Sequence, residues 1–153
     1  MEHVLTSGEL FAGISGFGLG MERAGIKTVW AVEIEPFAQK VLRHHYPGIP
    51  IHSDVKTCGA HNLTYVDILT FGFPCQDLSV AGKRAGLGGQ RSGLFFEAIR
   101  IAKEIRPTWA IAENVPGLFS SNRGSDMALV IAGLRECWPV VGWRILDSRY
   151  FGV

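Results

Sequence analysis

The sequence lacks the features that mark several protein classes. No apolar run approaches the roughly 20 residues that a membrane-spanning helix needs. The first residues, MEHVLTSGELF, contain no basic segment followed by a long apolar stretch. Charged residues make up only 19% of the 153 residues and apolar residues 47%, which excludes an intrinsically disordered chain. There is no internal repeat, low-complexity tract or Pro/Ser-rich linker, so we expect a single soluble, cytoplasmic domain.

Cysteine and net charge are also low. The three cysteines, Cys58, Cys75 and Cys137, are odd in number and widely spaced, which indicates reduced thiols rather than a disulfide framework. Fifteen basic and fourteen acidic side chains give a formal net charge of +1, so any nucleic-acid surface must be local. Cys58 and His61 have a spacing found in zinc sites, but no second pair accompanies them, and we expect no metal.

Short apolar segments rich in β-forming residues alternate with segments of helical periodicity. This alternation predicts a doubly wound α/β fold with a mostly parallel sheet. The predicted strands are 9–12, 28–32, 66–71, 109–112 and 143–146, with a short extended segment at 51–53. The predicted helices are 18–24, 36–45, 94–105 and 126–137. Ligands bind beyond the carboxyl ends of the strands in such sheets, so the loops that follow the strands are the candidate sites.

The first predicted strand runs into a glycine-rich turn, FAGISGFGLG. Such a turn lets a nucleotide approach the backbone, here near Gly13 and Gly16, although it also serves simply to pack a helix on a sheet. The dinucleotide pattern G-x-G-x-x-G and the triphosphate motif ending in G-K-[ST] are both absent, which argues against NAD and ATP. Glu33 ends the second strand 20 residues after Gly13, where a carboxylate can accept both hydroxyls of a ribose.

Three further strand ends carry candidate residues. Asp54 follows segment 51–53 and either binds an adenine amino group or caps the next turn, and the residue alone slightly favours the cap. Cys75 lies in GFPCQDLS, between Pro74 and polar residues, a position typical of a nucleophile rather than of a buried thiol. Glu113 and Asn114 bring a second acid to the same edge of the sheet, although an isolated Glu-Asn pair more often satisfies backbone groups at a strand end.

A cationic segment follows the cysteine. No acidic residue occurs between Leu78 and Phe96, whereas Lys83, Arg84 and Arg91 lie among several glycines. This composition favours a mobile loop that contacts a polyanion, and a solvated flexible loop is the ordinary alternative.

Taken in order, the segments FAGISGFGLG, VEIE, HSDV, GFPCQDLS, QRSGLFF and AENV resemble the successive motifs of the cytosine-C5 DNA methyltransferases. The resemblance covers nearly the whole chain, and the combination of FPCQ with ENV is highly specific. It implies the Rossmann-like sheet of methyltransferases that use S-adenosylmethionine. It also implies transfer of a methyl group from that cofactor to C5 of cytosine in double-stranded DNA.

The resemblance implies a role for each candidate residue. Cys75 would attack C6 of a cytosine flipped out of the duplex, and Glu113 would hydrogen-bond and help protonate the pyrimidine at N3. Phe11 would pack on the adenine, Glu33 would bind the ribose and Asp54 the adenine amino group. The implied cofactor-binding set is Phe11, Gly13, Gly16, Glu33, Asp54 and Pro74. The implied substrate-binding set is Gln76, Ser79, Lys83, Arg91 and Asn114, and Asn114 would also support the Pro74–Cys75 loop.

The sequence departs from the family at two places. Glu9 stands where the family usually has Asp, which is a mild change. The sequence ends at Val153, before a Pro-Gln-Arg-rich motif, the target recognition domain and the last sheet strand. The resemblance therefore implies that residues 1–153 are the N-terminal portion of the catalytic domain and are inactive alone. It also implies an exposed apolar edge at 143–146 that self-associates or binds a complementing C-terminal polypeptide.

Two alternatives remain open. One is a truncated, non-catalytic module that binds the cofactor or a partner chain. The other is an enzyme that methylates cytosine in RNA, which ranks lower because Phe73 and Ser79 are more similar to the DNA branch of the family.

Overall fold

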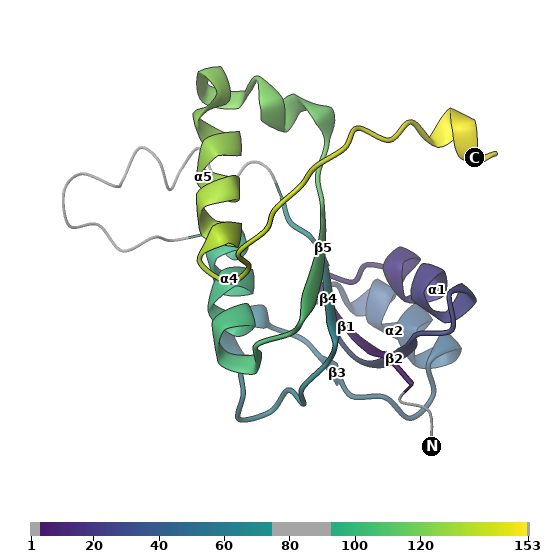
Figure 1. The fold of residues 1–153 in the computed structure, drawn as a ribbon. Coiled ribbons are helices and arrows are strands. Elements are labelled where there is room, and N and C mark those ends of the chain that lie inside the picture. The colour runs from purple at the N-terminus through teal and green to yellow at the C-terminus, as the bar shows by residue number, and fades with distance from the viewer. Residues whose placement is uncertain (1–3, 75–92, 153) are drawn as a thin grey trace.

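The structure is a computed structural model that describes residues 4–74 and 93–152. Within these residues all paired strands are parallel, in the order β3-β2-β1-β4-β5 (Figure 1). The strands are β1 (Thr6–Leu10), β2 (Lys27–Val32), β3 (Ile51–His52), β4 (Ile68–Gly72) and β5 (Trp109–Glu113).

Helices cover both faces of the sheet. Figure 1 shows α1 and α2 on one face and α4 and α5 on the other, which confirms the predicted doubly wound α/β fold. The helices are α1 (Gly16–Arg23), α2 (Pro36–His45), α4 (Leu94–Ile105) and α5 (Ser125–Arg135). Four short 3-10 turns are η1 (Val55–Thr57), η2 (Pro116–Phe119), η3 (Ser121–Gly124) and η4 (Ser148–Phe151). In the described part of the chain, no helix combines the length and the apolar character required to cross a bilayer.

Two helices have the predicted bounds because their local signals are strong. Pro36 begins α2, and the Glu35 side chain accepts a hydrogen bond from the Phe37 N–H at 3.3 Å as an N-cap. Helix α4 buries one apolar face against the sheet, and this face includes Phe95, Ile99 and Ala102 as the periodicity predicts. The main hydrophobic core lies between this helix and the strands.

Strand β1 begins at Thr6, three residues earlier than predicted. Its first residues are polar or small, yet Ser7 and Glu9 are buried because β1 is the central strand and has neighbours on both sides. The Ser7 hydroxyl is hydrogen-bonded to that of Thr28 at 3.1 Å. Gly8 leaves room for the Trp30 indole, whose Nε1 donates to the Thr64 carbonyl at 2.9 Å. A central strand usually contains a run of apolar residues, and the buried polar residues of β1 interrupt that run, so its start was not predicted.

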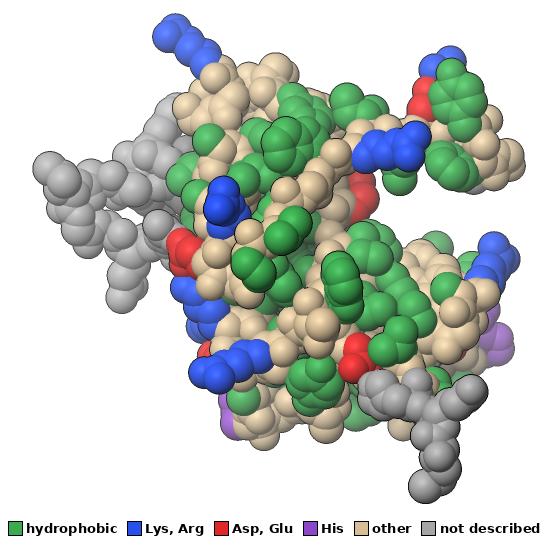
Figure 2. Space-filling model, viewed as in Figure 1, with side chains coloured by type: hydrophobic (Ala, Val, Ile, Leu, Met, Phe, Trp, Pro, Cys, Tyr) green, Lys and Arg blue, Asp and Glu red, His purple; other side chains and the backbone are tan. Residues whose placement is uncertain are grey.

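The strand predicted at 143–146 is wrong. Residues 140–147 have no regular secondary structure, and Trp143, Ile145 and Leu146 are about two-thirds exposed, at 65%, 64% and 65%. No backbone–backbone hydrogen bond joins 143–146 to another described residue, and an apolar sequence cannot form a strand without such a partner. Strand β5 forms one edge of the described sheet. Hydrophobic side chains gather on the face formed by β5 and the C-terminal segment (Figure 2).

We expect Gly8→Ala to destabilise the chain, because a Cβ at this position would overlap the buried Trp30 ring. Overpacking of this kind costs about 1–3 kcal/mol. The matched control is Gly20→Ala in α1, where an added Cβ meets nothing within 4 Å and should stabilise the helix by about 0.5–1 kcal/mol. Urea unfolding of the two variants should show opposite shifts, and a Gly8→Ala midpoint equal to wild type would contradict this packing.

Candidate active site

The glycine-rich turn between β1 and α1 has an unusual backbone. Phe11, Gly13 and Ser15 all have positive φ angles, of 56°, 54° and 69°. The turn is tied to the sheet by the Ala12 N–H, which donates to the Val32 carbonyl at 3.0 Å. The chain thus reverses sharply at the carboxyl end of the central strand and leads directly into α1.

The Glu33 carboxylate holds this turn. Glu33 follows β2 and is almost fully buried. Its Oε2 accepts the Gly13 N–H at 2.6 Å, and its Oε1 accepts the Glu35 N–H at 2.7 Å. Each oxygen keeps a second lone pair that no described group occupies, so the carboxylate can still accept hydroxyl donors from a ligand. The structure therefore brings together the glycine turn and the acid that lies 20 residues away.

A cavity of about 780 Å³ opens beside Glu33. Four of the predicted cofactor-binding residues line it, namely Phe11, Glu33, Asp54 and Pro74. Of the other two predicted residues, Gly13 is connected to the cavity through its bond to Glu33, and Gly16 begins α1 and is not among the lining residues. The volume of this cavity is in the range of pockets that bind small organic ligands.

Asp54 caps a turn and also lines the cavity. Its Oδ1 accepts the Lys56 N–H at 2.9 Å and so caps η1, as the simpler interpretation states. The same residue lines the cavity. The α4 residue Arg100 stabilises this turn, because its Nη2 donates to the carbonyls of Val55 and Cys58 at 3.2 and 2.9 Å. Neither Arg100 nor its ion-pair partner Glu97 was predicted from the sequence. Glu97 also lines the cavity.

Glu113 ends β5 and Asn114 follows it, and neither is among the residues that line this cavity. Gly72 is aligned with Glu113 in the β4–β5 register, and a Cβ on Gly72 would lie 3.0 Å from Glu113 Oε2. Gly72 itself lines the cavity, so the exposed Glu113 carboxylate adjoins it. Asn114 Nδ2 donates to the Phe73 carbonyl at 2.7 Å and thereby supports the backbone just before Pro74.

Five predicted residues, Cys75, Gln76, Ser79, Lys83 and Arg91, lie outside the described residues. The described residues on either side of that segment, Pro74 and Gly93, both line the 780 Å³ cavity.

The two described cysteines are in environments that do not favour the thiolate. Cys58 is buried, and burial raises the pKa of its thiol, with the nearby Asp54 charge acting in the same direction. Burial likewise raises the pKa of the half-buried Cys137. Thiolate is the reactive form, so neither residue has the environment of an activated nucleophile. Within 4–74 and 93–152, no group of three or more His, Cys, Asp or Glu side chains could hold a metal ion.

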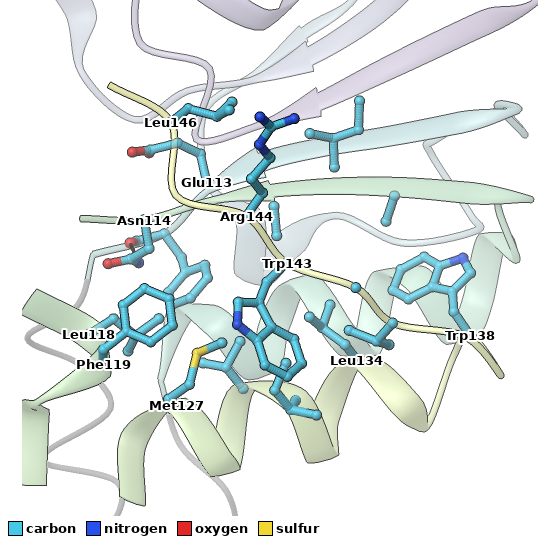
Figure 3. Close-up of a pocket in the computed structure, with 18 of the residues that line it drawn as sticks. Glu113, Asn114, Leu118, Phe119, Met127, Leu134, Trp138, Trp143, Arg144 and Leu146 are labelled. Atoms are coloured by element: carbon cyan, nitrogen blue, oxygen red, sulfur yellow. Dashed lines mark hydrogen bonds between the residues drawn. The ribbon is translucent and has the colours of Figure 1, made fainter. Parts of the chain in front are cut away.

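A second cavity, of about 520 Å³, lies between β5, α5 and the C-terminal segment. In Figure 3, Glu113, Arg144 and Leu146 lie toward one side of it, and Phe119 and Trp143 lie toward the other. It was not expected from the sequence, because residues 143–146 were predicted to form a strand of the sheet.

A second acidic side chain contacts the glycine turn. Glu9 in β1 is only 2% exposed, and its Oε2 accepts a hydrogen bond from the Ser15 hydroxyl at 2.5 Å. The backbone N–H groups of Phe17 and Gly18 lie near this carboxyl group and act to lower its pKa. Burial raises the pKa of Glu9, and repulsion from Glu33 adds to this effect. The sequence analysis noted Glu9 only as a departure from the family.

Comparison with known proteins agrees with this geometry. The family model described as C-5 cytosine-specific DNA methylase matches residues 5–153. The Type II methyltransferase M.Eco47II of Escherichia coli is 42% identical over 149 residues, which cover 96% of this chain and 35% of that protein. The Type II methyltransferase M2.BsuMI of Bacillus subtilis strain 168 is 38% identical over 148 residues, which cover 94% and 38%.

Solved structures show the same fold. The crystal structure of a Spodoptera frugiperda DNMT2 mutant has a TM-score of 0.61 at 26% identity and covers 87% of this chain and 41% of that one. The chain spans little more than a third of the length of the two Type II methyltransferases named above. On the match over residues 5–153 and on these relatives, the chain belongs to the C-5 cytosine-specific DNA methylase family.

Proposed function

We propose that this chain forms the N-terminal portion of the catalytic domain of a DNA methyltransferase that methylates C5 of cytosine. The observation that carries the proposal is the position of Gly72. It lines the 780 Å³ cavity and faces Glu113 across the β4–β5 pair, so a ligand cavity and an exposed carboxylate meet at one edge of the sheet. Membership of the family and the names of the Type II relatives support the same activity.

The cofactor in this proposal is S-adenosylmethionine, which supplies an electrophilic methyl group. The cavity residues suit its nucleoside. Phe11 offers an aromatic face to the adenine, the free lone pairs of Glu33 accept the two ribose hydroxyls, and Asp54 Oδ2 accepts the adenine amino group. Gly13 and Gly16 belong to the glycine-rich turn beside the cavity, and Pro74 lines the cavity.

The proposed reaction begins when the Cys75 thiolate forms a bond to C6 of a cytosine flipped out of the duplex. Glu113 hydrogen-bonds N3 and delivers a proton there, so the ring accepts the electron pair at lower cost. S-adenosylmethionine, when bound, would supply the methyl group to C5 of the resulting enamine and would leave as S-adenosylhomocysteine. A base then removes the C5 proton, its electron pair restores the C5–C6 double bond as the C6–S bond to Cys75 breaks, and N3 returns its proton to Glu113. Asn114 supports the backbone that carries Cys75 through its bond to the Phe73 carbonyl.

The remaining predicted residues are assigned to DNA. Gln76 and Ser79 follow the nucleophile in the sequence, and Lys83 and Arg91 supply positive charge without nearby acids. In this proposal, Ser79, Lys83 and Arg91 contact the phosphate backbone of the DNA, and Gln76 belongs to the substrate-binding set.

We expect Glu33→Ala to weaken binding of S-adenosylhomocysteine by at least about tenfold, since hydrogen bonds to a charged group contribute about 1.5–3 kcal/mol. Isothermal titration calorimetry measures this directly. Glu35→Ala is the matched control, because Glu35 also accepts a backbone N–H nearby but does not line the cavity. Equal affinities for wild type and Glu33→Ala would remove Glu33 from the cofactor site.

We expect Cys75→Ala to abolish covalent capture of duplex DNA that contains 5-fluorocytosine, because the C5 fluorine blocks the final elimination. Capture is measured as a gel-shifted, denaturation-resistant adduct of the 153-residue chain supplemented with the C-terminal part of a relative. Cys58→Ala and Cys137→Ala are controls that should retain capture, since burial disfavours both thiolates. Capture lost in Cys58→Ala would reassign the nucleophile, and capture of RNA in preference to DNA would change the substrate class.

We further propose that the β5 edge is covered by another polypeptide, either a complementing C-terminal chain or a second copy. Trp109 and Ile111 on β5 are 67% and 44% exposed, and an open apolar edge favours pairing. We expect the purified chain to self-associate and to transfer tritium from labelled cofactor to mixed-sequence duplex DNA only when the C-terminal part of a relative is added. Sedimentation gives the mass. A stable monomer that methylates DNA unaided would contradict this proposal, and cofactor binding without any complemented transfer would favour the non-catalytic module.

A further inference from the structure

The underside of the glycine turn contains a buried polar cluster with no part in the reaction described above. The cluster consists of Glu9 from β1, Ser15 from the turn and Tyr46 from the end of α2, and all three side chains are almost fully buried. The Ser15 hydroxyl donates to Glu9 Oε2 at 2.5 Å, and the Tyr46 hydroxyl lies nearby, since both hydroxyls approach Gly18. The Ser15 side chain is thus held by β1 and lies close to the end of α2.

The three side chains converge on Gly18, in the first turn of α1. A Cβ on Gly18 would overlap Ser15 Oγ, and it would lie 2.9 Å from Tyr46 Oη and 3.2 Å from Glu9 Oε2. The backbone N–H groups of Phe17 and Gly18 also lie near the Glu9 carboxyl group. Gly18 is therefore required for the carboxylate to reach the start of the helix.

The cluster compensates for an unfavourable backbone. Ser15 has φ 69° and ψ 53°, a left-handed conformation that a residue with a Cβ rarely adopts. Such residues persist only where the surroundings determine them. Here the Ser15 N–H donates to the Ala12 carbonyl at 2.7 Å, and the side chain is held by Glu9. Two residues earlier, Glu33 holds Gly13. Glu9 and Glu33 therefore fix opposite ends of one short turn.

We propose that Glu9 is a positioning residue for cofactor binding: acting through Ser15 and supported by Tyr46, it holds the glycine turn in the conformation that shapes the cofactor cavity. Phe11 and Glu33 line that cavity, and both are tied to the turn that Glu9 fixes. This inference rests on the proposed use of S-adenosylmethionine at this site. It concerns this chain in particular, because it depends on the reach of a glutamate.

The ionisation of Glu9 separates positioning from general stabilisation. The group that faces it from β2 is the Glu33 carboxylate, and the group from α2 is the Tyr46 hydroxyl, with Glu22 of α1 near that hydroxyl. Because burial raises the pKa of Glu9 in the folded state, its contribution to stability is present at low pH and is lost as pH rises through the folded pKa. Glu9→Gln cannot ionise, so it should remove this pH dependence of the unfolding midpoint.

The experiment compares binding of S-adenosylhomocysteine to the 153-residue chain and its variants by titration calorimetry at pH 8. We expect Glu9→Gln and Ser15→Ala to lose about tenfold in affinity, the loss of one well-placed hydrogen bond. Ser15→Gly should bind more tightly than Ser15→Ala, because glycine adopts the left-handed conformation without strain. The control is Ser7→Ala, which removes the buried hydrogen bond to Thr28 from the same strand and should leave affinity within about twofold of wild type.

The outcomes distinguish this inference from the proposed function. If wild type does not bind S-adenosylhomocysteine, the proposed cofactor is wrong and the inference falls with it. If wild type binds and both turn variants bind equally well, the positioning role alone is wrong. A loss in Ser7→Ala as large as in Ser15→Ala would also overturn it, because the effect would be general destabilisation. If Ser15→Ala does not fold, Tyr46→Phe removes only a hydroxyl and should still weaken binding about threefold.

Discussion

The parallel pairing of β1 with both β2 and β4 determines where chemistry can take place in this chain. Leu10 is level with Val32 on one side and with Phe71 on the other, so the three strands end at the same height. The residues that follow them therefore meet at one edge, and Phe11 and Glu33 line a common cavity there. Gly13 and Glu33 are 20 residues apart in the sequence, and the alignment of the strand ends brings them into contact.

The fold could be predicted from the sequence where the signal is local, and it could not where the signal depends on a neighbour. Pro36 with Glu35 before it defines the start of α2, and the apolar periodicity of 94–105 defines α4. The start of β1 was hidden because Ser7 and Gly8 are buried for reasons that lie in the facing strand. The failure at 143–146 has the same origin, since β-forming side chains do not supply the partner that a strand needs.

The same distinction applies to the site. The contact between Gly13 and Glu33 was predictable because strand ends converge in any parallel sheet. Asp54 could not be assigned to one role from sequence, since a carboxylate has two oxygens and the structure uses only one of them to cap η1. Asn114 was expected to support the loop before Cys75, and its bond to the Phe73 carbonyl fits that expectation. The roles of Glu33, Asp54 and Glu113 toward ligands stay predictions.

The Glu9 cluster was invisible in the sequence because its parts are far apart and each has an ordinary explanation. Its physical basis becomes clear at the N-terminus of α1. Ser15 occupies the N-cap position but makes no side-chain cap, and the first turn of the helix has no acidic residue. The backbone N–H groups of Phe17 and Gly18 instead lie near the Glu9 carboxyl group, and their influence lowers the pKa that burial raises.

A carboxylate at a helix N-terminus also interacts favourably with the partial positive charge there, which offsets part of the cost of burying it. A residue on the helix itself would cap α1 without touching the strand. A carboxyl group on β1 instead connects the strand to the turn that precedes the helix, and Glu33, which follows β2, holds the same turn through Gly13. The turn between β1 and α1 is therefore held by charges from the two strands that end beside it, and its shape follows from the register of the sheet.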